Sequence, residues 1–112
     1  MVFYELPAFE KMRESYLDDG AFKALQSELI ANPEAGAVIA GTGGLRKMRF
    51  ADQTRGKGKR GGLRVIYFHK SADDQIWLFT LYDKDEADDL TSDQRKALKA
   101  RLEQQIKARS LK

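Results

Sequence analysis

Basic side chains are concentrated in one stretch of this 112-residue chain, between Arg46 and Lys70. The stretch holds nine lysines and arginines against one acid, Asp52, whereas the whole chain has a net charge of only +3. The remaining residues are therefore acidic on balance. Like charges placed this close repel one another, and such a segment is typical of a site that binds a polyanion. The nine cations are Arg46, Lys47, Arg49, Arg55, Lys57, Lys59, Arg60, Arg64 and Lys70.

Two predicted strands and a loop must position these cations. Residues 45–51 and 63–70 have the composition of strands, the second being rich in β-branched and aromatic residues. Between them, four glycines alternate with four cations, and glycine lets backbone amides approach a phosphate closely. We therefore expect a basic loop that holds RNA backbone through Arg55, Lys57, Lys59 and Arg60. A merely solvated hairpin connection is the alternative.

Length and composition suit one folded domain that spans residues 1–112. The hydrophobic fraction is 42%, enough for an ordinary core, and the chain has no cysteine for a disulfide or a thiolate metal site. The beginning of the sequence lacks the pattern of a signal peptide, and no apolar run has the length of a membrane span. We expect a cytoplasmic protein that makes no contact with a membrane and needs no cofactor or metal.

The rest of the chain predicts an α+β fold. A short strand at 2–6 precedes a helix from Ala8, and a second helix, capped by Asp18 or Asp19, ends before Pro33. The basic unit follows, then a third nearly apolar strand at 76–82 and a final helix that starts at Thr91 with a capping box. The predicted order is β-α-α-β-β-β-α. We expect an antiparallel meander sheet with the helices packed on one face.

Three blocks of residues give the chain a resemblance to a known family. They are GTGGLRKMRFA (41–51), GKGKRGGLRVIYF (56–68) and LYDKDEADDLTSDQ (81–94), and their order and spacing cover nearly the whole chain. Together with the β-α-α start and the terminal helix, they resemble the RelE superfamily of bacterial toxins, and more narrowly its HigB-like branch.

This resemblance implies a function and a set of partners. The family implies a toxin of a type II toxin-antitoxin pair, an endoribonuclease that cuts messenger RNA in the ribosomal A site without a metal. The implied partners are the ribosome, the messenger and a cognate antitoxin of the helix-turn-helix, DNA-binding kind. An acidic or disordered antitoxin segment also suits a strongly cationic surface, because such a segment can fold upon it.

The resemblance also implies roles for individual residues. Arg64 stands where such toxins have an arginine that contacts substrate, and a planar, always charged guanidinium suits the extra negative charge of a phosphorane. Lys47 and Arg49 match basic positions of the preceding strand, with Arg46 as the substitute if the alignment slips by one. Lys84 matches a basic residue after the last strand. Lys47 or Lys84 is the expected general base, and the other lysine or Tyr82 the general acid.

Several alternatives remain open at this stage. The only histidine, His69, lies too far along its strand from Arg64 to match a histidine base, and a partly exposed strand-end role is expected. The acidic residues from 83 to 89 are expected to lead into the last helix. The same surface also suits a non-catalytic module that binds RNA or the ribosome, or a gyrase-directed toxin of the same fold.

Overall fold

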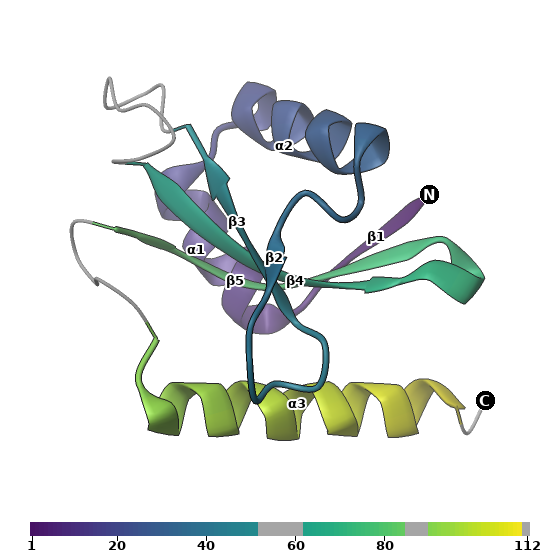
Figure 1. Cartoon of the computed structure of the whole chain (residues 1–112). Helices are drawn as coiled ribbons and strands as arrows, with labels where there is room; N and C mark the ends of the chain where they lie inside the picture. The colour runs from purple at the N-terminus through teal and green to yellow at the C-terminus, as the bar shows by residue number, and fades with distance from the viewer. Residues whose placement is uncertain (52–61, 85–89, 111–112) are drawn as a thin grey trace.

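The sheet at the centre of the molecule has five strands. The structure, a computed structural model, describes residues 1–51, 62–84 and 90–110 (Figure 1). The strand order in the sheet is β1-β5-β4-β3-β2. The strands are β1 (Val2–Glu5), β2 (Ala37–Val38), β3 (Arg46–Phe50), β4 (Leu63–Lys70) and β5 (Gln75–Asp83).

The predicted meander is confirmed. β3 pairs with β4, and β4 with β5, both in antiparallel fashion, and a short 3-10 turn (Ser71–Asp73) joins the last two strands. β1 is added to the outer edge of β5 in parallel. The two-residue strand β2, which the sequence did not indicate, pairs with the beginning of β3. The observed sheet is therefore mixed.

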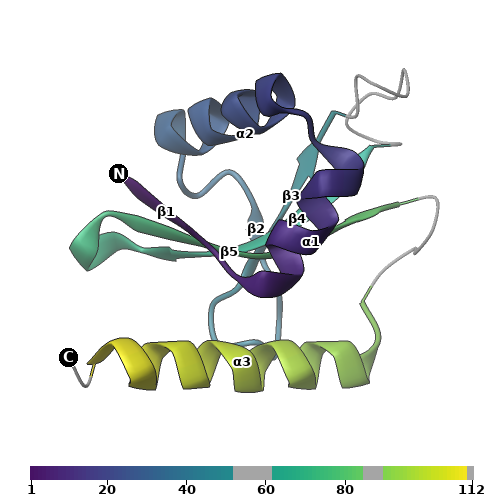
Figure 2. The same cartoon turned by 180° about the vertical axis from the view of Figure 1, so that it is seen from behind.

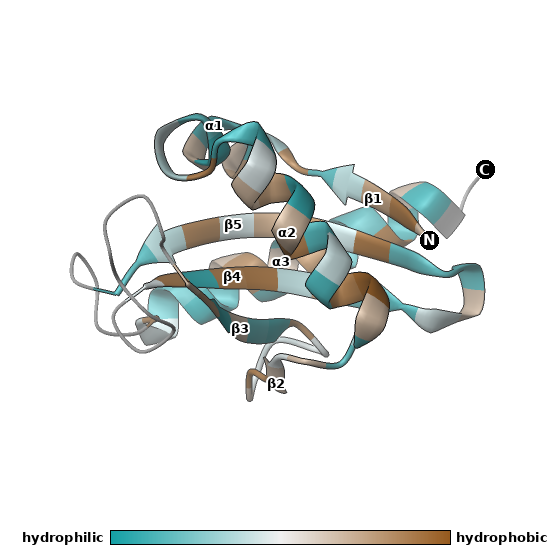
Figure 3. Ribbon diagram, turned by 90° about the horizontal axis from the view of Figure 1, so that it is seen from above, coloured by the Kyte–Doolittle hydropathy of each residue, from teal (hydrophilic) through white to brown (hydrophobic). Residues whose placement is uncertain are grey.

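Helices cover both faces of the sheet, so the prediction of helices on one face is wrong. α1 (Pro7–Tyr16) and α2 (Asp19–Ala31) lie on one face, and α3 (Ser92–Ser110) lies on the other (Figures 1 and 2). The middle parts of β4 and β5 are apolar, as Figure 3 shows. A strand that is apolar on both faces needs cover on both, and α3 supplies the second layer.

Each face of the sheet has its own hydrophobic core. On the α1 and α2 face, strand residues pack against helix residues such as Phe9, Leu25 and Leu29. On the other face, Trp77, Phe79 and Ile66 pack against Leu102, which is 1% exposed and comes from α3. We call these the α1–α2 core and the α3 core. Membership of a core tells on which face of the sheet a strand residue points.

Local signals fix the helix ends. The Asp18 carboxylate accepts a hydrogen bond of 2.7 Å from the amide of Ala21, which is the predicted cap of α2. At the start of α3, the Thr91 amide donates to Gln94 Oε1 at 2.8 Å, and the Gln94 amide donates to Thr91 Oγ1 at 3.1 Å. The predicted capping box is therefore confirmed. None of the helices described is long and apolar enough to cross a membrane.

Candidate nucleic-acid interface

Alternation along β3 sorts its cations onto two faces. Met48 and Phe50 belong to the α1–α2 core. Successive side chains of a strand point to opposite faces, so Lys47 and Arg49 point to the face that α3 covers. Arg46, one residue before Lys47, points the other way. The sequence-predicted alternatives Arg46 and Lys47 therefore lie on opposite sides of the sheet.

A row of three predicted site residues crosses the sheet. Arg49 on β3 lies directly opposite Arg64 on β4, and Arg64 lies directly opposite Tyr82 on β5. Directly opposed side chains on one face have Cβ atoms about 5 Å apart, and two like charges at that distance destabilise a sheet. We call these three residues the cross-strand row.

A β-bulge brings Tyr82 into this row. Ile66 pairs with Thr80, whereas the next residue, Tyr67, pairs with Leu78, so β5 has one extra residue at this point. As a result Leu78 and Leu81 both point into the α1–α2 core although they are three residues apart. Phe79 and Tyr82 likewise both pack on the α3 side. With regular alternation, Tyr82 would face away from Arg64; the bulge re-aims it.

The members of the site differ in exposure. Arg64 is only 4% exposed, and its Nη1 donates to the carbonyl oxygen of Leu63 at 3.3 Å. Arg49 is exposed, and Tyr82 is half-buried. Lys84 is exposed as well, and its amide donates to the Gly62 carbonyl at 3.2 Å, which holds it beside the beginning of β4. The site thus combines an anchored guanidinium with accessible cations around it.

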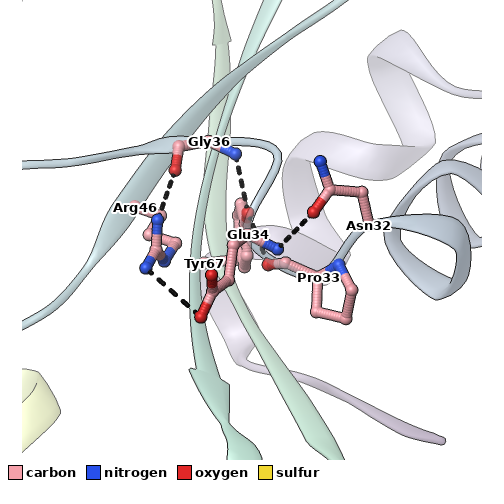
Figure 4. A network of polar contacts seen from close by, with 6 residues as sticks. All are labelled: Asn32, Pro33, Glu34, Gly36, Arg46 and Tyr67. Carbon is pink, nitrogen blue, oxygen red and sulfur yellow. Dashed lines mark hydrogen bonds and ion pairs between the residues drawn. The ribbon is translucent and has the colours of Figure 1, made fainter.

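Arg46 belongs to a different structure, a polar network under β2 (Figure 4). Its Nη1 donates to the Gly36 carbonyl at 2.8 Å, and its Nη2 lies 3.9 Å from Glu34 Oε1. The Tyr67 hydroxyl accepts from the Gly36 amide at 2.9 Å and donates to the Pro33 carbonyl at 2.8 Å. These contacts hold the segment between α2 and β2 against the sheet.

Tyr67 is a titratable member of this network, and its pKa is shifted. Burial raises its pKa above the usual value near 10, while the hydrogen bond from Gly36 and the charge of Arg46 act in the opposite direction. The hydroxyl therefore stays protonated, which it must be to donate to Pro33. Tyr67 and Arg46 form scaffold contacts on the face opposite the cross-strand row.

A cleft of about 560 Å³ adjoins the free edge of β3. β2 pairs only with Arg46 and Lys47, so among the residues described β3 has no strand partner on that side from Met48 onward. The cleft separates this edge from the end of α2, and Lys47 and Arg49 both line it. Its other lining residues are Glu28, Ala31, Ala35, Ala37 and Met48. Two of the predicted site cations are thus accessible from the side of the sheet.

Other predicted residues are placed apart from this site or not at all. Arg55, Lys57, Lys59 and Arg60, predicted to hold RNA backbone, lie outside the described residues. His69 is half-buried and lies opposite Ile76, five residues along β4 from Arg64. Asp83 is the last residue of β5 and is fully buried, so it belongs to the sheet rather than to a lead into α3. No signal in the sequence indicated that Asp83 would belong to this β-bulged strand.

No cluster of potential metal ligands is found in the described part of the chain. Three or more histidine or carboxylate side chains do not gather anywhere in residues 1–51, 62–84 and 90–110. The cross-strand row offers a ligand two guanidinium groups and a phenol, and Lys47 and Lys84 add ammonium groups beside it. Guanidinium and ammonium groups bind phosphate oxygens, and guanidinium does so through two parallel hydrogen bonds.

Comparison with known proteins supports the fold. No protein-family model matches the sequence. Among solved structures, the chain is similar to a mutant of the Escherichia coli toxin RelE in the free state, with a TM-score of 0.52 and 14% sequence identity. The match covers 78% of this chain and 86% of that one. At this identity the likeness concerns the fold alone, and the chain has the RelE-like fold.

Proposed function

We propose that this protein is the toxin of a toxin-antitoxin pair, of the HigB-like branch, and that it cleaves messenger RNA in the A site of the translating ribosome. The observation that carries the proposal is the direct opposition of Arg49 and Arg64, with Tyr82 completing the cross-strand row. RNA cleavage needs positive charge to stabilise the phosphorane and a proton donor for the leaving oxygen. The two cations and the phenol on this face of the sheet supply both. The RelE-like fold and the three sequence blocks support the same assignment.

The reaction is a transesterification within the RNA. The ribose 2′-oxygen loses its proton and forms a bond to the adjacent phosphorus, and the bond from phosphorus to the 5′-oxygen breaks. The departing 5′-oxygen takes up a proton, and the products are a 2′,3′-cyclic phosphate and a 5′-hydroxyl. The phosphorane between these steps holds more negative charge than the starting diester. Fixed cations that meet this added charge lower the barrier.

The geometry suggests how the residues divide this work. Arg64, buried and anchored on the Leu63 carbonyl, holds a preorganised guanidinium for the phosphorane, and Arg49 across from it binds the second phosphate oxygen. Lys47 lies on the same face, two residues before Arg49, and Lys84 lies next to the start of β4. One of these lysines accepts the 2′-hydroxyl proton. The phenol of Tyr82, or the other lysine, protonates the leaving oxygen.

The proposed partners follow from the same assignment. A DNA-binding antitoxin of the helix-turn-helix kind neutralises the toxin in the cytoplasm, and the ribosome supplies the messenger in a cleavable conformation. The chain acts as a single toxin domain over residues 1–112. The accessible cations Arg49 and Lys84 suit both an RNA backbone and an acidic antitoxin segment, which makes competition between the two a natural mode of control.

A non-catalytic RNA-binding module is the second candidate, because Arg64 is only 4% exposed. In that case exposed cations bind RNA backbone, and Arg64 serves the sheet. The two functions differ in their response to Arg64→Lys. A binding module tolerates a lysine stem with the same charge, whereas cleavage that depends on a bidentate guanidinium does not.

Primer extension on messenger RNA from a translating extract tests the proposal. Wild-type protein should produce new cuts confined to translated codons, and Arg64→Ala should weaken them by roughly 10²- to 10³-fold, the usual effect of removing one preorganised electrostatic group. Circular dichroism of each variant separates lost chemistry from lost fold. If folded wild-type protein makes no cuts at any codon, the nuclease assignment is wrong. A supercoiling assay then distinguishes the binding module from a gyrase-directed toxin.

A further inference from the structure

A groove runs between β3 and one flank of α2. The cleft at the free edge of β3 adjoins a second cavity of about 360 Å³, and Glu28 of α2 lines both. The second cavity is bounded by the first turns of α2 and, on the strand side, by Phe50 and Ala51. The groove therefore follows β3 from Lys47 to Ala51.

The backbone edge of β3 forms one wall of this groove. Lys47, Met48 and Arg49 all line the cleft, although their side chains alternate between the two faces of the sheet. The Ile39 amide donates to the Leu45 carbonyl at 2.8 Å, so the backbone polar groups of Leu45 point toward β2. In an antiparallel pair every second residue directs its N–H and C=O to the same side. Those of Lys47 and Arg49 therefore point to this edge as well.

The N–H and C=O that Arg49 directs to this edge have no partner strand among the described residues. β2 pairs Ala37 with Lys47, and the same register would set Ala35 opposite Arg49. The Ala35 amide instead donates to the Asn32 carbonyl at 3.0 Å, within the turn that follows α2. The chain thus leaves the sheet one position before it would cover Arg49, and the edge there can accept another strand.

The opposite wall of the groove is built largely of small apolar residues. Where the cleft passes the end of α2, Ala31, Ala35 and Ala37 line it. Ile30 and Val38 are next to these alanines in the chain, and each is 57% exposed, an unusual position for a large hydrophobic side chain. Alanines leave room for an incoming side chain, and exposed apolar groups beside them gain free energy when a partner covers them.

A segment that pairs with this edge must have two different faces. The residue directly opposite Arg49 points to the same face of the sheet as Lys47 and Arg49, where an acidic side chain is favoured. Its two neighbours point to the other face, toward the alanine wall, where apolar side chains fit. The acids of the groove, Asp18 and Glu28, come from the α2 side, so a further acid is disfavoured there.

We propose that the free edge of β3 binds an extended segment of a partner protein, in which acidic and apolar residues alternate, as an additional strand of the sheet. Backbone hydrogen bonds to Arg49 supply affinity, and the two faces of the segment supply specificity. A second copy of β3 fits poorly, because it would bring further cations against Lys47 and Arg49. The inference rests on the proposed function for the source of the segment, which is then the antitoxin. A bound segment engages the Arg49 guanidinium and so withdraws it from RNA.

Fluorescence anisotropy with synthetic peptides tests this assignment without requiring cleavage. The probe is a short fluorescein-labelled peptide in which glutamate and valine alternate. N-methylation of its glutamates removes the N–H groups that face Arg49, and should weaken binding at least about tenfold. N-methylation of its valines alters only N–H groups that face away from β3, and should leave the affinity unchanged. A peptide with the same composition, but with glutamates and valines in separate blocks, should bind as weakly as the peptide methylated on glutamate.

Two protein variants with the same change in net charge locate the bound peptide. Ala31→Glu places an acid on the apolar wall of the groove and should weaken binding at least about tenfold. Ala108→Glu adds the same charge at an exposed position of α3 and should bind the peptide like wild type. Both alanines lie near the C-terminal end of a helix, so the cost to folding is matched. Equal affinities of the two variants, or of the two methylated peptides, would overturn the inference.

Further outcomes separate this inference from the proposed function. If the peptides behave as predicted while wild-type protein cuts no translated message, strand addition at β3 stands and the nuclease assignment fails. If wild-type protein cuts messages and neither methylation changes binding, strand addition is wrong and the nuclease assignment stands. A dimer in analytical ultracentrifugation that Ala31→Glu dissociates and Ala108→Glu does not would assign the edge to a second copy and overturn the proposal.

Discussion

Arg46 and Arg49 lie three residues apart on β3, yet the structure gives them opposite surroundings. Arg46 is bound by the Gly36 carbonyl and lies near Glu34, within the network around Tyr67. Arg49 is exposed, points to the other face and lies opposite a second arginine. The comparison teaches that a basic strand divides its cations between the two faces of the sheet, because successive side chains point to opposite faces. Arg46, on one face, holds the scaffold together, whereas Arg49, on the other face, is exposed.

The largest effect is expected where Arg64 is removed, alone or together with Arg49. Arg64→Ala should slow cleavage by roughly 10²- to 10³-fold. Arg49→Ala should slow it by about tenfold, because this variant keeps the anchored guanidinium of Arg64. Residues that act on one phosphate are not additive. The double variant should therefore be about as slow as Arg64→Ala alone, measured by single-turnover cleavage on programmed ribosomes. Strictly multiplicative losses would show that the two arginines act on different groups.

Tyr82→Phe tests the consequence of the β-bulge. Loss of a general acid typically costs about 10²-fold or more in rate, and the ring that packs on the α3 core is retained. Tyr4→Phe is a matched control, because Tyr4 is also a half-buried tyrosine at the edge of that core, at the β1 end of the sheet. Both variants should unfold at nearly the wild-type denaturant concentration. Equal cleavage by both would assign the proton to a lysine.

Tyr67→Phe tests the scaffold side of the comparison. It removes the partner of the Gly36 amide and of the Pro33 carbonyl, and each buried group left unpaired costs about 1–3 kcal/mol. The midpoint of denaturant unfolding should fall, while cleavage by the folded protein stays unchanged. A variant that loses cleavage without losing stability would place Tyr67 in the site and contradict the division between the two faces.

The raised pKa of Tyr67 adds a pH dependence to this prediction. The folded-state pKa lies above that of the unfolded chain, so folding favours the protonated phenol. The contribution of Tyr67 is fully present below about pH 10 and is lost as pH rises through the folded pKa. Wild-type protein should therefore lose more stability than Tyr67→Phe across this alkaline range. Parallel declines in the two proteins would show that other groups account for the loss.

Much of the scaffold could be predicted because its signals are local. The bounds of β4 coincide with the predicted strand at 63–70, and the caps at Asp18 and Thr91 follow from side chains within three residues of the amides they bind. The meander follows from short connections between successive strands. The doubly apolar character of β5 was recognised, but α3 was not identified as its cover, because its few apolar residues give little sign of which face it packs on.

The site was harder to predict because it depends on the face of the sheet to which each side chain points and on the register in which the strands pair. Alternation of Met48 and Phe50 already separates Arg46 from Arg49, a signal in the sequence that favours Arg49 for the ligand face. The extra residue of β5, which turns Tyr82 toward Arg64, leaves no trace in a run of apolar residues. The burial of Arg64 also depends on distant elements. Residue types could thus nominate the cations, whereas only the fold shows which of them meet.

Cleavage rates of Arg46→Ala and Arg49→Ala, measured side by side on programmed ribosomes, test the central claim most directly. Each variant removes one arginine from the same strand, so their net charges are identical. We predict that Arg46→Ala loses about 1 kcal/mol of stability and keeps its cleavage rate, whereas Arg49→Ala keeps its stability and cleaves about tenfold more slowly. Equal rates in the two variants, or a slower Arg46→Ala, would contradict the assignment of RNA to the face that carries Arg49, Arg64 and Tyr82.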